Sequence, residues 1–589
     1  MEESVPPVTL LDYGAGNVQS VVNAILKLGV RVNYVQKPED ILAAERLVFP
    51  GVGAFGSCVA ALRELGYFEP LQRYLLDDRP FFGICLGMQT LFEASEESPG
   101  VPGLGILPGK VMRFPHDLDL AVPNMGWNGV APMLAHPWPL ETPTPRYYFV
   151  HSYRVPMPPE GNADWALACS DYGGRFVCAV RRGNCVATQF HPEKSGNAGL
   201  ELLNRWLTSI APEKSLAVIS GPPLAPPPPA RRIIACLDVR SNDAGDLVVT
   251  KGDQYDVREA NEVRNLGKPV ALAERYYHEG ADEVSFLNIT AFRDLVLTDQ
   301  PMLDMLRAAA AQVFVPLTVG GGIRAYVDKS GKTYSAVEVA DAYFRAGADK
   351  ISIGSDAVEA AQSFFANGKQ LTGETSIETI SKKYGRQAVV VSVDPRRVYV
   401  ADPASTPHGC VELGSPGGTQ PGPEGQRFAW YCCTIKGGRE DSDMDVVQLV
   451  QAVEALGAGE ILLNCIDRDG QCSGYELELI RQVKAACSLP VIASSGAGNP
   501  AHFAAALAPA TASPSGGGAD AALAAGIFNW REVPTSCNAQ SAANSQTLPA
   551  VLLSTLLQVK LHFENEAVIP VRCCDASRTS AKSSCCCLL

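Results

Sequence analysis

Short apolar runs alternate with amphipathic segments over residues 8–210. The runs end in glycine or polar residues, and the segments between them repeat apolar residues at every third and fourth position. The strand-like runs are VTLLDYG, RVNYV, RLVFPG, FFGICLG and YYFVHSY, and the clearest helices are AGNVQSVVNAILKLG and FGSCVAALRELG. This order predicts an α/β domain with a mostly parallel sheet.

A proline-rich stretch, ISGPPLAPPPPARR, interrupts the pattern at residues 219–232. Proline at this density excludes helix and central strand, and it favours a stiff, extended chain. We therefore place a first domain at residues 1–211 and a linker at residues 212–230.

Eight strand-like runs follow the linker, and most of them precede a helical stretch. Eight such units predict a (β/α)8 TIM barrel over residues 231–572, with its active site at the C-terminal ends of the strands. The runs are IIACLDV, EVSFLNI, VPLTVGG, DKISIGS, AVVVSVD, EILLNCI, LPVIASS and DAALAAG.

The two halves of this barrel repeat each other. CLDV resembles SVDP, GADEVSFLNI resembles GAGEILLNCI, LTVGGG resembles IASSGAG, and GADKISIGS resembles GADAALAAG. Four matches in the same order predict a half-barrel internal repeat. The second half is longer, mainly because of HGCVELGSPGGTQPGPEG, which we expect to be a loop after the fifth strand.

Composition places the chain among globular proteins. Of its 589 residues, 46% are hydrophobic and 19% are charged, and the net charge is −14. This acidic balance argues against nucleic-acid partners, and there is no run of about 18 apolar residues to span a membrane. The start, MEESVPPVTLLDYG, has no basic and apolar leader, so we expect a cytoplasmic protein, or a plastid protein if the start is truncated.

The 18 cysteines are unusual in number but not in spacing. No pair has zinc-ligand spacing, so we expect reduced thiols, no metal and no cofactor. The tail, residues 573–589, is small and polar, and we expect it to be disordered. Its last four residues, Cys-Cys-Leu-Leu, permit prenylation, although the second cysteine fits that motif poorly.

Cys85 lies between Gly83 and Gly87, where an apolar strand runs into a helix. A nucleophile on such a sharp turn needs glycines on both sides, and the start of a helix favours the thiolate form. Taken alone, the pattern fits a buried structural cysteine equally well.

Two further motifs favour catalysis. In TQFHPEKS, His191 could take a proton from Cys85 while Glu193 orients the imidazole ring. In FPGVGAFG, the turn of Gly51, Val52 and Gly53 leaves amides to stabilise an oxyanion, unless it is merely a glycine-rich turn.

Together these motifs resemble class I glutamine amidotransferases over about 200 residues. DYGAGN, PGVGAFG, NMGWN, FVHSY and HPEKS are similar to the glutaminase of the imidazole glycerol phosphate synthase family. The resemblance implies that Cys85 forms a γ-glutamyl thioester and releases ammonia from glutamine. It also implies that Gln89, His151 and Ser152 hold glutamine.

Asp238 ends the first barrel strand and Asp394 ends the fifth, on the opposite side of the barrel. Two carboxylates facing each other suit acid and base work on a substrate held between them, although each alone could simply cap its strand. Glycine-rich turns after strands three, four, seven and eight offer amides for a phosphate at each end of the substrate, and they include Gly322, Gly354, Ser355, Gly496, Ala525 and Gly526.

The barrel resembles the cyclase of the same family, through stretches such as VVTKGDQ, TVGGGIR, CTIKGGRE and GAGEILLNCIDRDGQCSGY. The fusion is similar to the fungal and plant form. The resemblance implies that Asp238 and Asp394 are the acid/base pair and that Lys251, Asn464, Asp469, Gly470 and Ser494 line the site. The implied substrate is N′-(5′-phosphoribulosyl)-formimino-AICAR phosphoribonucleotide (PRFAR), and the products are imidazole glycerol phosphate and AICAR, in histidine biosynthesis.

Ammonia must then pass between the two sites. Arg232, Glu283, Lys350 and Glu460 match the family's charged ring at the N-terminal barrel mouth, which could equally be a salt-bridged plug. Lys194 and Asp349 match a contact between the domains. We hypothesise that PRFAR in the barrel activates Cys85.

Three other functions remain at this point. The glutaminase could supply another acceptor, the chain could be a non-catalytic scaffold, or the barrel could be a sugar bisphosphate isomerase. The doubled barrel, the retained nucleophile and carboxylates, and the CTIKGGRE and DRDGQCSGY stretches favour the bifunctional enzyme. We expect one chain to carry both activities as a monomer, with glutamine and PRFAR as its small-molecule partners.

Overall fold

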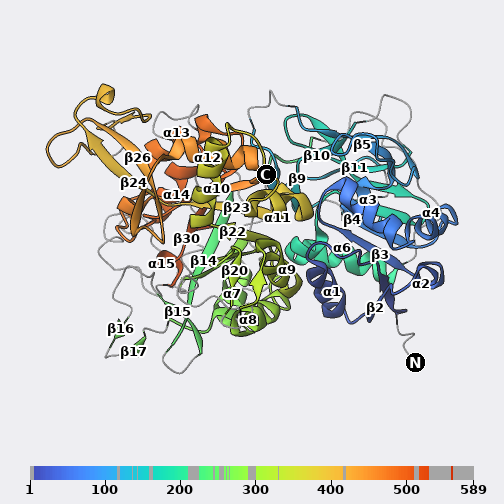
Figure 1. Ribbon diagram of the computed structural model, residues 1–589. Helices are drawn as coiled ribbons and strands as arrows, with labels where there is room; N and C mark the ends of the chain where they lie inside the picture. The colour runs from blue at the N-terminus through green and yellow to red at the C-terminus, as the bar shows by residue number, and fades with distance from the viewer. Residues whose placement is uncertain are drawn as a thin grey trace.

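The protein consists of two α/β bodies that lie side by side (Figure 1). The computed structural model describes residues 5–115, 120–134, 137–141, 144–157, 164–209, 225–242, 246–250, 258–259, 262–263, 266–289, 300–328, 331–414, 420–509, 516–529 and 559–560. The predictions for Lys251, for most of the linker and for the tail after residue 572 lie outside these residues. None of the described helices is long and apolar enough to cross a membrane.

Five parallel strands form the part of the first sheet that carries chemistry. Their order is β2-β1-β3-β4-β13. The strands are β1 (Val8–Leu10), β2 (Val32–Tyr34), β3 (Leu47–Gly51), β4 (Phe81–Cys85) and β13 (Cys185–Thr188). The helices of this domain are α1 (Val18–Lys27), α2 (Pro38–Ala43), α3 (Phe55–Glu64), α4 (Phe68–Leu76), α5 (Leu86–Gln89) and α6 (Gly196–Thr208). The predicted strands and helices are therefore present, and apolar faces such as that of α1, with Val21, Val22 and Ile25, are buried.

Antiparallel strands extend this sheet beyond β13. They are β12 (Arg175–Arg182), β10 (Tyr153–Pro156), β11 (Ala166–Asp171) and β8 (Ala131–Pro132), and β6 (Leu107–Arg113) then pairs in parallel with β5 (Phe92–Ser95). A separate pair, β7 (Asn124–Asn128) and β9 (Tyr147–His151), lies toward the second domain. The prediction of a mostly parallel sheet therefore holds for the part of the sheet that contains Cys85, and the remaining strands are mostly antiparallel.

All eight predicted strands of the second domain form a closed parallel barrel. Its order is β14-β18-β19-β22-β23-β28-β29-β30, and β30 pairs back with β14. The strands are β14 (Arg232–Ser241), β18 (Glu283–Asn288), β19 (Leu317–Gly320), β22 (Lys350–Ile353), β23 (Val389–Val393), β28 (Glu460–Asn464), β29 (Val491–Ser494) and β30 (Ala521–Ala524). Buried side chains from different strands, among them Ile234, Val390 and Leu462, pack together in one cluster.

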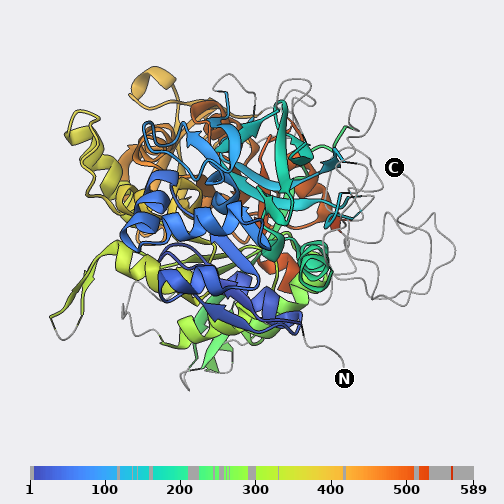
Figure 2. The same cartoon turned by 90° about the vertical axis from the view of Figure 1, so that its right-hand side faces the viewer.

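Helices surround the barrel between its strands. They are α7 (Pro269–His278), α8 (Gln300–Ala310), α9 (Ala336–Ala346), α10 (Ser355–Ala366), α11 (Ser376–Tyr384), α12 (Val446–Leu456), α13 (Leu477–Ala486), α14 (Pro500–Leu507) and α15 (Gly526–Asn529). Several begin with a side-chain cap, as at Ser335, Thr375 and Asp445. Figure 2 views the molecule from the side of the first domain, which lies in front of the barrel.

The segment after the fifth barrel strand folds into a small antiparallel sheet. Strand β26 (Phe428–Ile435) lies at its centre, and β24 (Pro395–Val400), β27 (Glu440–Asp445) and β25 (Val411–Glu412) each pair with it. The prediction of a plain loop is therefore wrong at Val411 and Glu412. The aromatic and β-branched residues of β26 favour a strand. Because β27 pairs with β26 only from Cys432 onward, Phe428 and Ala429 are left to pair with Val411 and Glu412.

The end of the linker is docked against the first domain. The Ala230 amide donates to the Trp127 carbonyl at 2.8 Å, so residue 230 bridges to β7. Gly129 lies so close to Pro227 that a side chain at Gly129 would meet the proline ring at 2.4 Å. Two residues after Ala230, Arg232 begins the barrel, so the covalent junction lies within the domain interface.

Candidate active sites

Cys85 occupies a strained turn between β4 and α5. Its φ of +53° is in the left-handed region, which a residue with a side chain rarely adopts. The turn is packed closely against β3, because a Cβ on Gly87 would lie 2.3 Å from the Phe49 carbonyl oxygen. Only glycine fits there, and the thiol is held in a conformation typical of a nucleophile elbow.

His191 and Glu193 form a buried pair beside the thiol. His191 Nδ1 lies 2.8 Å from Glu193 Oε1, and both side chains are almost fully buried. Burial lowers the pKa of His191, but the Glu193 carboxylate and the Cys85 thiol outweigh it, so the pKa is raised well above its usual value. His191 Nε2 has no hydrogen-bond partner among the described residues, which leaves it available to exchange a proton.

Two glutamines complete the floor around the thiol. Gln189 Nε2 donates to Cys85 Sγ at 3.4 Å, and Gln89 Nε2 donates to Gln189 Oε1 at 3.0 Å. Gln89 also donates to the Tyr153 carbonyl at 3.2 Å. Sequence reasoning found Gln89 and missed Gln189, although its place two residues before His191 at the end of an apolar run was a usable signal.

The turn Gly51–Val52–Gly53 lies directly beside the elbow. Gly51 pairs in register with Cys85, and Gly53 has a φ of +130°. The Tyr13 hydroxyl donates to the Val52 carbonyl at 2.5 Å, which fixes the peptide that joins Val52 to Gly53. The turn predicted to stabilise an oxyanion therefore lies next to Cys85.

His151 is the last residue of β9 and Ser152 follows it, at the edge of the same site. Both ring nitrogens of His151 are engaged, at 3.2 Å from Asn124 Nδ2 and 2.7 Å from the Tyr153 carbonyl oxygen. Burial lowers the pKa of His151 to about 3, so its ring is neutral and packs as an aromatic group. Ser152 Oγ is buried without a hydrogen-bond partner among the described residues.

A cleft of about 540 Å³ joins these residues to the barrel. Cys85, Gln89, His151, Ser152 and His191 line it, together with barrel residues from α11, α12 and the start of β22. Glu97 also lines the cleft, and burial raises the pKa of its carboxyl group while a hydrogen bond from the Phe55 amide opposes the rise. Glu97 was not predicted, because an acid in a polar stretch carries no spacing signal.

The two aspartates lie at the opposite end of the barrel. Asp238 is in the C-terminal half of β14, and Asp394 directly follows β23, four strands away around the ring. Asn464 Nδ2 donates to Asp394 Oδ1 at 2.8 Å, and Ser392 Oγ donates at 3.3 Å. Burial raises the pKa of Asp394, and these two hydrogen bonds oppose the rise.

The remaining predicted substrate residues are at the same end of the strands. Asn464 and Ser494 are the last residues of β28 and β29, and the others follow strand ends, namely Gly322, Gly354, Ser355, Asp469, Gly470, Gly496, Ala525 and Gly526. The Ser355 hydroxyl accepts a hydrogen bond from the Lys436 amide at 2.8 Å, which ties the turn after β22 to the small sheet. The structure thus gathers the described members of the set at one face.

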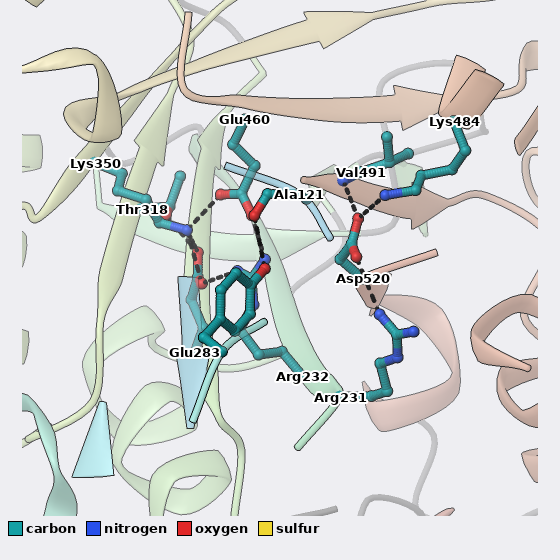
Figure 3. A network of polar contacts seen from close by, with 11 residues as sticks. Ala121, Arg231, Arg232, Glu283, Thr318, Lys350, Glu460, Lys484, Val491 and Asp520 are labelled. Carbon is teal, nitrogen blue, oxygen red and sulfur yellow. Dashed lines mark hydrogen bonds and ion pairs between the residues drawn. The ribbon is translucent and has the colours of Figure 1, made fainter. Parts of the chain in front are cut away.

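A square of charges closes the N-terminal mouth of the barrel (Figure 3). Lys350 Nζ lies 2.8 Å from Glu283 and 2.6 Å from Glu460, and Arg232 contacts the same two carboxylates. All four residues begin a barrel strand and are essentially inaccessible to solvent. Burial raises the pKa of Glu460, but Arg232 and Lys350 outweigh it and the pKa is lowered.

The square also faces the cleft of the first domain. Lys350 and Tyr148 both line that cleft, and Glu283 and Arg232 are close enough to influence the pKa of Tyr148, which burial raises well above its usual value. The cleft that contains Cys85 therefore reaches the closed end of the barrel.

Comparison with known proteins defines the class of each domain. Residues 9–209 match the family model for glutamine amidotransferase class-I, and residues 232–533 match the model for histidine biosynthesis protein. The chain thus joins a class I glutamine amidotransferase to a histidine-biosynthesis barrel.

Relatives with the same two-domain organisation define the family more closely. The chain is 52% identical over 547 residues to imidazole glycerol phosphate synthase hisHF of Emericella nidulans, covering 90% of this chain and 96% of that protein. It is 53% identical over 530 residues to the chloroplastic protein of that name from Arabidopsis thaliana, covering 90% and 86%. It is 52% identical over 538 residues to the Schizosaccharomyces pombe protein, covering 89% and 96%.

The chain belongs to the imidazole glycerol phosphate synthase family, in the form that carries glutaminase and cyclase in one polypeptide. Its place is in histidine biosynthesis, as the resemblance of both domains implied. The alternatives of another acceptor, a scaffold and an isomerase are excluded by the same matches.

Proposed function

We propose that Cys85 attacks the side-chain amide of glutamine, with His191 and Glu193 as its partners. The thiol proton passes to His191 Nε2, and sulfur bonds to the amide carbon. His191 then gives the proton to the leaving nitrogen, so ammonia departs and a γ-glutamyl thioester remains. Water hydrolyses the thioester to glutamate and restores the thiol. The buried contact between His191 and Glu193 beside the strained Cys85 carries this proposal.

The oxyanion that forms at each addition needs fixed donors. Amides of the turn formed by Gly51, Val52 and Gly53 are the nearest candidates, since Gly51 is in register with Cys85. Gln89, His151 and Ser152 would hold glutamine in the cleft, and the Glu97 carboxylate is suited to the α-ammonium group.

Ammonia released at Cys85 would enter the barrel through the charged square. Tyr148 and Lys350 line the cleft, and Lys350 is bonded to both carboxylates of the square. We propose that Arg232, Glu283, Lys350 and Glu460 form a gate, which must rearrange to let ammonia pass because Arg232 and Lys350 each bridge the two carboxylates. Beyond it, apolar residues such as Ile234 and Leu462 would keep ammonia unprotonated.

At the far face, we propose that Asp238 and Asp394 act as acid and base on PRFAR. Ammonia adds to the substrate, ring closure follows, and imidazole glycerol phosphate and AICAR leave. The glycine-rich turns at Gly322, Gly354 with Ser355, Gly496, and Ala525 with Gly526 would bind the two phosphates through their amides. Asn464, Asp469, Gly470 and Ser494 would line the site, and Lys251 keeps this role as a prediction. Domain limits of 1–211 and 231–572 fit this division.

A coupled assay tests the two-site proposal. Glutamate and AICAR release are measured with PRFAR, using glutamine or ammonium as the nitrogen source. Cys85→Ala should abolish glutamine-dependent turnover and keep ammonium-dependent turnover, while Cys410→Ala, outside both sites, should change neither. Loss of both activities in Cys85→Ala would contradict the separate roles of the two domains.

A further inference from the structure

Two arginines, one from each domain, line the cleft that contains Cys85. Arg113 ends β6 of the first domain, and Arg386 lies between α11 and β23 of the barrel. Both line the cleft together with Glu97 and Tyr153. Arg113 is the register partner of Tyr153, whose carbonyl accepts a hydrogen bond from Gln89, so this cationic end is directly connected to the floor of the nucleophile site.

These guanidinium groups have few anionic partners. Arg386 donates to two carbonyl oxygens, of Glu454 at 2.9 Å and Ala458 at 3.2 Å. Within the described part of the chain, neither Arg386 nor Arg113 is in an ion pair closer than 4.0 Å. Burial lowers the pKa of Arg386, the Glu454 carboxylate opposes this, and Arg113 adds to it.

Two positively charged side chains that line one cleft, neither of them in an ion pair with a described carboxylate, favour an anionic ligand. The amino acid proposed for this cleft has a carboxylate, and Glu97 offers the opposite charge for its ammonium group. A guanidinium group binds a carboxylate through two parallel N–H donors, which fixes orientation as well as charge. The two charges of free glutamine therefore have partners of opposite sign in the cleft. Glu97 from the first domain faces the ammonium group, and Arg113 and Arg386, one from each domain, face the carboxylate.

We propose that Arg386, together with Arg113, binds the α-carboxylate of glutamine. This inference rests on the proposed glutaminase function and extends it, since the barrel then supplies a substrate-binding residue to the other domain's active site. Arg386 is a specificity determinant, and it acts on binding rather than on the bond that Cys85 breaks.

The test compares ligands with and without that carboxylate. Glutamine hydrolysis is followed in the full chain with saturating PRFAR, and L-glutamate and 4-aminobutanoate amide (which keeps the amine and the side-chain amide) are added as inhibitors. In Arg386→Gln, the KM for glutamine and the inhibition constant of L-glutamate should each rise about tenfold or more, because a charged hydrogen bond is lost. kcat and inhibition by the amide should stay within about twofold of wild type.

Conservative and matched variants separate binding from folding. Arg386→Lys should recover part of the lost affinity, and Arg113→Gln should show the same pattern as Arg386→Gln. Arg345→Gln changes an exposed arginine on α9 that pairs with Asp341, and it should have no effect. Ammonium-dependent turnover reports that each variant is folded.

An unchanged KM for glutamine in Arg386→Gln, or an equal loss of affinity for L-glutamate and for the amide, would overturn the inference. Either result would leave the glutaminase proposal standing so long as Cys85→Ala lacks glutamine-dependent turnover. Retained turnover in Cys85→Ala would instead refute the proposed function itself.

Discussion

Lys194 Nζ lies 2.6 Å from Asp349 Oδ2, across the boundary between the two domains. Lys194 is only three residues beyond His191, and Asp349 directly precedes β22, which begins with Lys350 of the charged square. Asp349 also accepts hydrogen bonds from the Asn17 side chain and the Leu317 amide. One largely buried ion pair therefore connects the turn after His191 to the N-terminal end of the barrel.

Removing Lys194 should weaken this connection. Lys194→Met leaves the Asp349 carboxylate without its cation, and breaking a buried pair in this way costs about 3 kcal/mol. We expect glutamine-dependent turnover to fall at least tenfold while ammonium-dependent turnover is retained. The double variant Lys194→Met with Asp349→Asn should recover part of the loss, and Lys332→Met on the exposed hairpin serves as the control. Equal losses with both nitrogen sources would contradict a role in coupling.

Glu193 should set the alkaline limit of glutamine hydrolysis. In the proposed mechanism, His191 keeps the proton that it gives to the leaving ammonia up to high pH, because Glu193 raises the pKa of His191. Glu193→Gln removes that cause, so the pKa falls and the alkaline limb of kcat/KM for glutamine moves to lower pH. Glu201→Gln, on the exposed face of α6, should leave the profile unchanged. If the alkaline limb of kcat/KM for glutamine does not move in Glu193→Gln, another group must supply the proton.

Asp394→Asn and Asp238→Asn should each abolish cyclisation. Loss of a general acid or base lowers the rate by about 10²–10⁴-fold, whichever nitrogen source is used. Glutamine hydrolysis by Cys85 should persist in both variants, measured as glutamate release with PRFAR bound. Asp443→Asn provides a fully exposed control in the small sheet. Substantial cyclisation by either variant would assign the chemistry to other residues.

The charged square should limit ammonia loss. Glu460→Gln removes a carboxylate that binds both Arg232 and Lys350, and so leaves two buried cations with one carboxylate between them. We expect the square to open and ammonia to escape, so that more than one glutamate is released for each AICAR. The measurement is the ratio of the two products, and a ratio near one in Glu460→Gln would show that the square does not retain ammonia.

The barrel could be predicted because each of its strands is marked by a pattern within a few residues of sequence. Each strand reads as a short apolar run, and the half-barrel repeat confirms the order. The elbow at Cys85 was predictable because the turn needs Gly87, and the placement of Asp238 and Asp394 on opposite sides of the barrel followed from strand order alone.

Arg386 was missed for a different reason. It reaches the cleft of Cys85 from the other domain, and no spacing in the sequence reports such a contact. The pairing of Val411 with β26 likewise depends on a free strand edge that only the folded sheet offers.

The bond between Ala230 and Trp127 has a consequence for how the enzyme responds to dilution. Two separate subunits dissociate when their concentration falls below their dissociation constant, and ammonia made by a lone glutaminase is then wasted. Here the end of the linker is itself part of the interface between the domains, so the effective concentration of one domain near the other is fixed by the fold. The yield of product per glutamine should therefore stay constant however scarce the protein becomes in the cell.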